Sequence, residues 1–251
     1  MGEHELFLEG LTREQALKLA EAARHGAAAV APPQGGRSPV ESATGGGSVV
    51  ARATAAPATA SPLPVLPASY DELRAAALTC TRCRLSETRT QVVFSDGVID
   101  ARLVVVGEAP GANEDETGLP FVGAAGKYLD LLLSSVGLSR EDSVYICNVL
   151  KCRPPGNRNP MEDEIEACSP FLKKQLELIR PQALLAVGSF ASQLLTGSGK
   201  VALGKLRGEV HSYEGVPLVC TYHPAALLRN PKWTRSFWDD LQLLRNLLDS
   251  A

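Results

Sequence analysis

Residues 102–111 read RLVVVGEAPG, a run of aliphatic and mostly β-branched residues that stops at a glycine-rich loop. Such a run is typical of a strand buried on both faces of a parallel sheet. Three later runs are equally short and apolar. The four predicted strands are Arg102 to Val106, Val144 to Val149, Ala183 to Val187 and Pro217 to Thr221. Together they predict a central, mainly parallel four-stranded sheet.

Longer stretches with helical periodicity surround these strands. They lie at Ser69 to Leu78, Lys127 to Val136, Met161 to Ile179, Phe190 to Leu195 and Trp233 to Leu248. Alternation of strands and helices predicts a three-layer α/β/α fold, with helices covering both faces of the sheet. Ligands of such sheets bind beyond the carboxyl ends of the strands. We therefore expect the functional site in the loops that begin at Gly107, Asn148, Gly188 and Tyr222.

The start of the chain differs in composition from the rest. Residues 1–25 show a short helical pattern, and residues 26–69 are mostly Ala, Pro, Gly, Ser and Thr, which cannot bury enough apolar surface to offset the entropy of ordering. We predict a helical segment at 1–25, a flexible linker at 26–69 and one folded domain at 70–251. The leading helix is a candidate for docking a protein partner, and a loosely attached tail is the alternative.

Overall charge does not indicate a nucleic-acid partner, because the formal net charge is −3. Contacts with DNA would have to rest on local clusters, of which Lys151, Arg153 and Arg158 form one. We found no secretory signal and no run of roughly 20 apolar residues that could span a bilayer. The sequence therefore predicts a cytoplasmic monomer that does not bind membranes.

The six cysteines favour metal binding or catalysis over disulfides in a reducing compartment. Cys80 and Cys83 form a C-x-x-C pair, while Cys152 and Cys168 form a wider pair, all outside the predicted strands. Four thiolates suit either zinc or an iron–sulfur cluster, and the spacing does not decide between them. Cys147 and Cys220 lie in predicted strands, so we expect them to be buried and to bind no metal.

Three ordered segments resemble the signature motifs of family 4 uracil-DNA glycosylases. They are GEAPGANEDETGLPFVG at 107–123, NVLKCRPPGNR at 148–158 and HPAALLRNP at 223–231. The resemblance covers roughly residue 70 to the C-terminus. It implies a uracil-DNA glycosylase fold and an enzyme of base excision repair that flips uracil out of DNA, hydrolyses its N-glycosidic bond and leaves an abasic site. It also implies a 4Fe-4S cluster held by Cys80, Cys83, Cys152 and Cys168.

The same resemblance assigns a uracil pocket. Phe121 would stack on the base, and Asn148 would present an acceptor and a donor to the imide edge of uracil, which cytosine would mismatch. His223 would donate a hydrogen bond to O2 of the departing base.

Other residues complete this expected pocket. Glu108 would position the attacking water, with Asn157 as the alternative, and Glu114 would flank C5 of uracil and exclude the methyl group of thymine. Backbone N–H groups from Ala109 to Gly111 would line the pocket.

Contacts with the DNA strand are expected beside the pocket. Leu227, Leu228 and Arg229 suit a wedge that fills the gap left by the flipped nucleotide. Phosphate contacts are expected from Lys151, Arg153, Arg158 and Lys232, with affinity falling as salt rises. Two rival interpretations remain at this point, namely a non-enzymatic DNA-binding or polymerase-associated module and a zinc-stabilised hydrolase of nucleotides.

Overall fold

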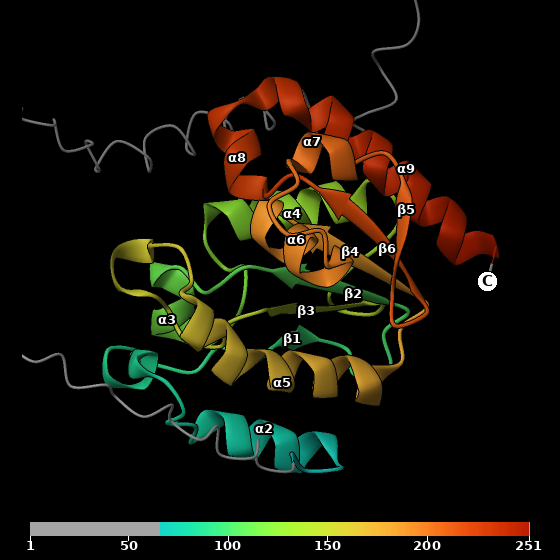
Figure 1. Cartoon of the computed structure of the whole chain (residues 1–251). Helices are drawn as coiled ribbons and strands as arrows, with labels where there is room; N and C mark the ends of the chain where they lie inside the picture. Colours follow the sequence, from blue (N-terminus) through green and yellow to red (C-terminus); the bar gives the residue numbers. More distant parts are fainter. Residues whose placement is uncertain (1–65, 251) are drawn as a thin grey trace, which may run out of the picture.

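The computed structural model of the chain describes residues 66–250. The helical segment predicted at 1–25 and the linker up to residue 65 lie outside the described residues. The described part of the chain is a single sheet covered by helices on both faces (Figure 1).

Within residues 66–250 the sheet has six strands, in the spatial order β1-β3-β2-β4-β6-β5. They are β1 (Asp96–Gly97), β2 (Leu103–Gly107), β3 (Val144–Asn148), β4 (Ala183–Val187), β5 (Val210–Tyr213) and β6 (Val216–Thr221). The four inner strands run parallel and are the four predicted strands. Two antiparallel edge strands, β1 and β5, were missed, because neither contains a sustained apolar run.

Five helices match the predicted ones. They are α2 (Tyr70–Leu78), α4 (Ala124–Ser134), α5 (Glu162–Ile179), α6 (Ser189–Thr196) and α9 (Thr234–Ser250). Shorter helices were not predicted, because one or two turns are too few to show a periodicity. These are α3 (Ala112–Thr117), α7 (Leu203–Leu206), α8 (Pro224–Arg229) and the 3-10 helices η2 (Arg84–Glu87), η3 (Pro155–Asn157) and η4 (Pro231–Trp233). In the part of the chain that is described, no helix is long and apolar enough to cross a membrane.

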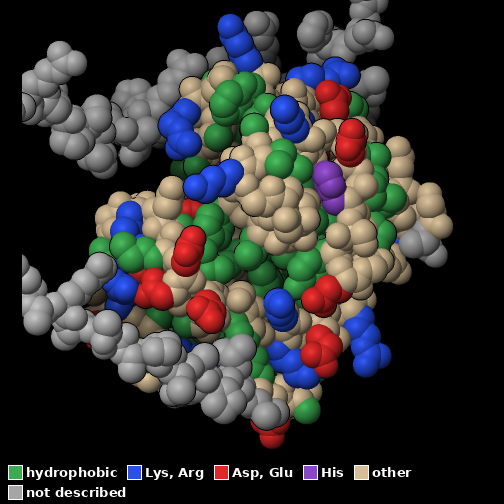
Figure 2. All heavy atoms as spheres, in the orientation of Figure 1, with side chains coloured by type: hydrophobic (Ala, Val, Ile, Leu, Met, Phe, Trp, Pro, Cys, Tyr) green, Lys and Arg blue, Asp and Glu red, His purple; other side chains and the backbone are tan. Residues whose placement is uncertain are grey.

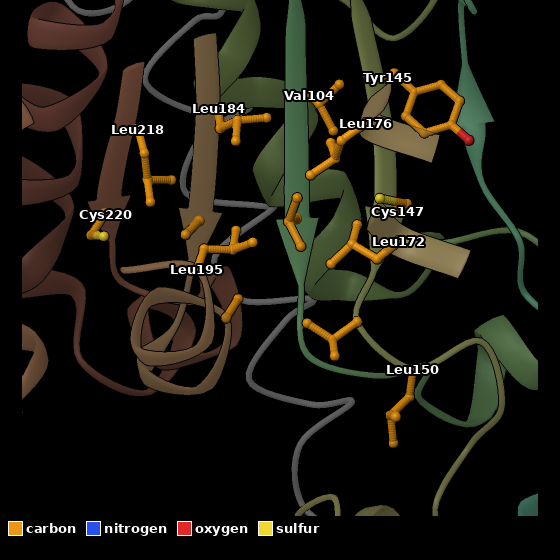
Figure 3. Close-up of a cluster of buried hydrophobic side chains, with 14 of the residues drawn as sticks. Val104, Tyr145, Cys147, Leu150, Leu172, Leu176, Leu184, Leu195, Leu218 and Cys220 are labelled. Carbon is orange, nitrogen blue, oxygen red and sulfur yellow. The ribbon is translucent and has the colours of Figure 1, made fainter. Parts of the chain in front are cut away.

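Alternate side chains of the parallel strands enter two apolar layers. Figure 3 shows part of one layer, which contains Val104, Tyr145, Leu184 and Leu218 from the strands with Leu172, Leu176 and Leu195 from α5 and α6. The opposite layer contains Leu103, Val105, Ile146 and Leu185 from the strands with Leu129, Leu133, Phe237 and Leu241 from α4 and α9. Each parallel strand is therefore buried on both faces, which is why its sequence is apolar without interruption.

Helix α2 adds a partial outer layer. It packs on α5 on the side away from the sheet, where Leu73 and Ala77 contact Phe171 (Figure 1). The segment that follows α2 carries Cys80 and Cys83. This packing brings the first cysteine pair to the N-terminal half of α5, where Cys168 lies.

The strand order reverses at β2, which sets the carboxyl edge of the sheet as the expected ligand site. After β2 the chain crosses to β3 on one side, and after β3 it returns to β4 on the other side of β2. Open parallel sheets bind ligands at such a reversal. Gly107 and Asn148 end β2 and β3 in register, and the N–H of Gly188 donates to the carbonyl oxygen of Thr221 at 2.9 Å. The loops singled out by the sequence therefore meet at one edge.

Candidate active site

Asn148 and Phe121 converge over the glycine that ends β2. A Cβ atom on Gly107 would lie 2.3 Å from Oδ1 of Asn148 and 2.6 Å from Cζ of Phe121, so the missing side chain makes room for both. Asn148 is only 2% exposed, and its Oδ1 has no hydrogen-bond partner among the described residues. An unpartnered buried acceptor is costly. This acceptor is therefore available to a ligand that carries a donor.

His223 lies against the same aromatic ring. Its imidazole stacks on Phe121 with ring centroids 5.6 Å apart and planes inclined by 26°. Gly188 allows this approach, because a Cβ there would lie 3.2 Å from Cβ of His223, and its φ of +96° is one that glycine readily adopts. The candidate site thus gathers residues from the carboxyl ends of four strands, β2, β3, β4 and β6.

The protonation of His223 follows from its surroundings. Nδ1 accepts a hydrogen bond from the backbone N–H of Ala225 at 3.2 Å, at the start of α8. Burial, assisted by the positive charge of Arg229, lowers the pKa of His223 to about 4. The ring is therefore neutral at physiological pH, with its proton on Nε2, which makes Nε2 a donor.

Glu108 directly follows Gly107 and is half-buried. Its backbone carbonyl accepts from the N–H of Leu150 at 3.0 Å, which joins the β2 loop to the β3 loop. Burial raises the pKa of the Glu108 carboxyl above its ordinary value. A half-buried carboxyl group with a raised pKa is suited to accepting a proton.

The turn that carries Phe121 is held from two sides. Phe121 has φ of +54°, a left-handed conformation that is unfavourable for a bulky residue. Oε1 of Glu114 accepts from the N–H groups of Val122 and Gly123, at 3.0 Å each. On the other side, Arg140 donates to the carbonyl oxygens of Pro120 at 3.1 Å and of Phe121 at 3.0 Å.

Arg140 holds this turn in place, and the sequence did not reveal it. Its guanidinium also pairs with Asp96 at 2.8 Å and with Asp130 at 2.7 Å, so carboxylates orient it toward the Phe121 turn. Glycine at position 126 lets α4 touch this turn, because a Cβ there would overlap the carbonyl of Phe121. No local motif marks Arg140, since its partners are distant in the sequence.

Several expected pocket residues are placed differently. Asn157 is exposed, and its Oδ1 accepts from Nε of Arg153 at 2.7 Å, so as an alternative water-positioning group it lacks the burial of Glu108. Glu114 is half-buried, and its second oxygen lies toward Gly111, where a Cβ would be 2.7 Å away. It borders the turn that carries Phe121 and stays a candidate for excluding a methyl group.

Two of the expected DNA contacts are wrong. Lys151 is 2% exposed, and its Nζ donates to the backbone oxygen of Asn148 at 2.7 Å, so it cannot reach a phosphate. Leu227 is 1% exposed and packs in the core, so it cannot act as a wedge. Leu228 is half-buried and Arg229 is exposed, so both stay candidates. Arg158 forms a two-pronged ion pair with buried Glu164, which ties up its guanidinium.

The four cysteines of the expected metal site line one cavity, together with Arg82, Arg89, Lys151 and Phe171. Arg89 donates to the sulfur of Cys152 and the backbone N–H of Lys151 donates to the sulfur of Cys168, both at 3.2 Å. Nη1 of Arg82 is buried without a hydrogen-bond partner. These donors and positive charges suit an anionic group surrounded by thiolates.

The four thiols line this cavity without forming a site for a single metal ion. Within residues 66–250, no three His, Cys, Asp or Glu side chains lie close enough together to hold one metal ion. Zinc bound by four cysteines requires sulfurs about 3.8 Å apart, from Zn–S bonds of about 2.3 Å. Cys147 and Cys220 are fully buried in strands, as expected.

An amide and a neutral imidazole lie against one aromatic ring at the carboxyl edge of a parallel sheet, an arrangement typical of α/β proteins that bind a planar ring. The sequence model of the uracil DNA glycosylase superfamily matches residues 94–242, more than half of the chain. The chain therefore belongs to the uracil DNA glycosylase superfamily, and its relatives place it in the type-4 family.

Two type-4 uracil-DNA glycosylases illustrate the similarity. The protein of Archaeoglobus fulgidus is 41% identical over 186 residues, which cover 71% of this chain and 93% of the relative. That of Thermotoga maritima is 48% identical over 152 residues, covering 60% and 79%. A type-5 uracil-DNA glycosylase of Pyrobaculum aerophilum is more distant, at 34% identity over 63% of this chain and 83% of the relative.

Proposed function

We propose that this chain removes uracil from DNA by hydrolysing the N-glycosidic bond, leaving an abasic site. The observation that carries the proposal is the buried, unpartnered Oδ1 of Asn148 beside the stacked rings of Phe121 and His223. Uracil presents its N3–H donor between two carbonyl acceptors, so it can satisfy this amide, whereas cytosine presents an acceptor at N3. Membership of the type-4 family favours this function over a non-enzymatic binding module.

His223 stabilises the departing base. Cleavage leaves negative charge on uracil, part of which resides on O2. A neutral imidazole already carries a proton on Nε2, and in a dry pocket this N–H donates a hydrogen bond that stabilises the charge on O2. The hydrogen bond from the N–H of Ala225 to Nδ1 fixes the ring in this tautomer. The lowered pKa of His223 keeps the ring neutral under physiological conditions.

Glu108 acts on the attacking water. The sugar develops positive charge as the base leaves, and a carboxylate next to it both stabilises this charge and accepts a proton from water. The backbone of the β2 loop, from Ala109 to Gly111, lines the pocket beside it. Glu114 flanks the base and leaves no room for a methyl group at C5, so thymine is excluded.

We further propose that Cys80, Cys83, Cys152 and Cys168 hold a 4Fe-4S cluster. When bound, the cluster supplies four iron–thiolate bonds that join the segment after α2 to the β3 loop and to α5. Lys151 lines the same cavity and holds the backbone oxygen of Asn148, so it connects the two sites. Hydrolysis of the glycosidic bond requires no electron transfer, which makes this role structural.

Cationic side chains that are accessible to solvent are the remaining candidates for binding phosphates. Arg153, Arg229 and Lys232 lie near the pocket loops and are accessible or half-accessible, so we propose that they contact the DNA backbone. The cytoplasmic location, the monomeric state and a partner for the N-terminal segment stay predictions.

The decisive experiment measures uracil release from a uracil-containing oligonucleotide. We expect Asn148→Ala and His223→Ala each to lower the rate by roughly 10²- to 10³-fold. Asn246→Ala, on the exposed face of α9, and His211→Ala, on edge strand β5, are matched controls and should keep wild-type rates. Full activity in both pocket variants, or no release by the wild type, would overturn the proposal.

A further inference from the structure

A column of stacked planar groups leads from the core to the surface beside His223. Trp233, the last residue of η4, stacks on Tyr222 with ring centroids 4.6 Å apart and planes inclined by only 11°. The guanidinium of Arg207 lies 4.2 Å from the centroid of the same tyrosine ring. One face of a ring accommodates one planar group at such a distance, so Arg207 and Trp233 occupy the two faces of Tyr222.

The inner end of this column is anchored. Arg207 forms an ion pair of 2.6 Å with Asp240, which is buried in α9, and it also donates to the backbone oxygen of Ser236. Tyr222 is half-buried and packs against both apolar layers. The outer end is different, because Trp233 is 39% exposed. The column is thus a rigid support that presents an indole to solvent.

The surroundings of Trp233 are cationic. Arg229 and Lys232 are exposed, and neither forms an ion pair within residues 66–250. Lys and Arg side chains gather over α8 and the first turns of α9 on the face seen in Figure 2. Tyr222 immediately precedes His223, so the column stands at the rim of the candidate pocket. An exposed aromatic ring beside unpaired cationic side chains is suited to binding a polyanion that carries flat apolar rings.

We propose that Trp233 is a stacking platform for a nucleobase that neighbours the extruded uracil on the same strand, with Arg229 and Lys232 binding the adjoining phosphates. The proposal rests on the proposed function and adds a second base-binding site to it. Stacking on an aromatic side chain is indifferent to base identity, because every base has a π face. A preorganised ring loses little conformational entropy on binding. The site therefore increases affinity for the strand without reading its sequence.

The test pairs a protein change with a substrate change. The substrates are a single-stranded oligonucleotide with thymine on both sides of uracil, and the same strand with abasic sugar analogues in place of those thymines. On the first, we expect Trp233→Ala to raise KM by roughly 5- to 100-fold and to leave kcat unchanged. On the second, wild type and variant should have equal KM. Trp233→Phe keeps a ring and should stay within about threefold of the wild type.

Controls separate stacking from charge and from surface hydrophobicity. The rise in KM caused by Lys232→Ala should become smaller as the salt concentration increases. The rise in KM caused by Trp233→Ala should persist at high salt. Ile99→Ala removes another exposed apolar side chain and should change nothing. The proposal is overturned if Trp233→Ala leaves KM unchanged, or if it raises KM equally on both substrates.

A binding measurement keeps this test independent of catalysis. The chain has two tryptophans, at positions 233 and 238. An oligothymidylate without uracil should quench the fluorescence of the wild type and of Trp238→Phe, but not that of Trp233→Phe. Quenching without uracil release would retain the platform and reject the proposed glycosylase. Quenching that survives in Trp233→Phe would reject the platform.

Discussion

Phe121 is the residue around which the candidate site is built. Its left-handed backbone costs energy, and such strain persists where the surrounding structure over-determines the conformation. Glu114 holds the N–H side of the turn, and Arg140 holds the carbonyl side. The strained turn aims the ring at His223 and Asn148. We therefore regard Arg140 as a positioning residue for the stacking ring.

Replacing Arg140 with methionine tests this role. The variant loses the hydrogen bonds to the turn, and Asp96 and Asp130 are left without their cation. We expect KM for uracil-containing DNA to rise about tenfold or more, measured by steady-state uracil release. Arg140→Lys keeps the charge but lacks the forked geometry of the guanidinium, so its KM should lie between those of the wild type and of Arg140→Met. A lower melting temperature with unchanged KM would show that Arg140 serves stability alone.

The pH dependence of kcat should report Glu108. The proposed role needs the ionised carboxylate, while burial favours the neutral form and raises the pKa above 4.5. The active fraction therefore declines as pH falls through this raised value. The acid limb should lie at a higher pH than for an ordinary glutamate and should vanish in Glu108→Gln, whose rate should be roughly 10²- to 10⁴-fold lower. His223, with a pKa of about 4, remains neutral from pH 6 to 9, so a limb that survives in Glu108→Gln would contradict the assignment.

At the scale of elements, the short helix α8 carries one leucine that packs in the core and one that is a candidate for contacting DNA. Leu227 and Leu228 are identical residues in different environments. Leu227 is buried in the core beside the sheet, whereas Leu228 is half-buried and borders solvent. A helix of this length shows no periodicity from which the inward face could be read. Only the packing of α8 against α4 distinguishes them.

We expect the two leucine variants to differ in kind. Leu227→Ala should destabilise the fold by about 2–5 kcal/mol, measured by chemical denaturation, because it leaves a cavity in the core. Leu228→Ala should unfold like the wild type but release uracil more slowly from duplex than from single-stranded DNA, because only a duplex needs the gap filled. Equal activity of Leu228→Ala on both substrates would exclude the wedge.

For the whole molecule, the proposed 4Fe-4S cluster would act as a cross-link. Its proposed ligands come from the segment after α2, from the β3 loop and from α5, which are also joined by packing, by hydrogen bonds and by the ion pair between Arg84 and Asp163. A cross-link between distant segments stabilises mainly by restricting the unfolded chain. The proposed cluster therefore bears on the stability of the layer formed by α2 and α5.

Removing one ligand should therefore affect folding first. We expect Cys83→Ala to lose iron and visible absorption and to lower the melting temperature by roughly 4–20 °C, from a loss of about 2–5 kcal/mol. Cys147→Ala is the matched control, because this cysteine is buried in β3 and binds no metal in the proposal. It should keep its iron. Unchanged stability in Cys83→Ala with lost uracil release would reject a structural role.

The sequence by itself determined the parallel core of the sheet, its main helices and the loops that carry the site. Continuous apolar runs and helical periodicity are local signals, and parallel strands place their carboxyl ends at one edge. The sequence therefore predicts that Asn148 and Gly107 lie side by side. The motifs resembling family 4 pointed to the same residues, and the family comparisons confirm that membership.

Only the tertiary structure decided which loop residues face the pocket, the core or solvent. Lys151 and Leu227 resemble surface DNA contacts in sequence, yet both are buried, and Arg140 reaches the site from outside every motif. The edge strands likewise form only because a neighbouring strand offers its backbone. The physical reason is common to all of these. Packing between segments distant in the chain sets the environment of a loop or one-turn helix, and no local periodicity encodes it.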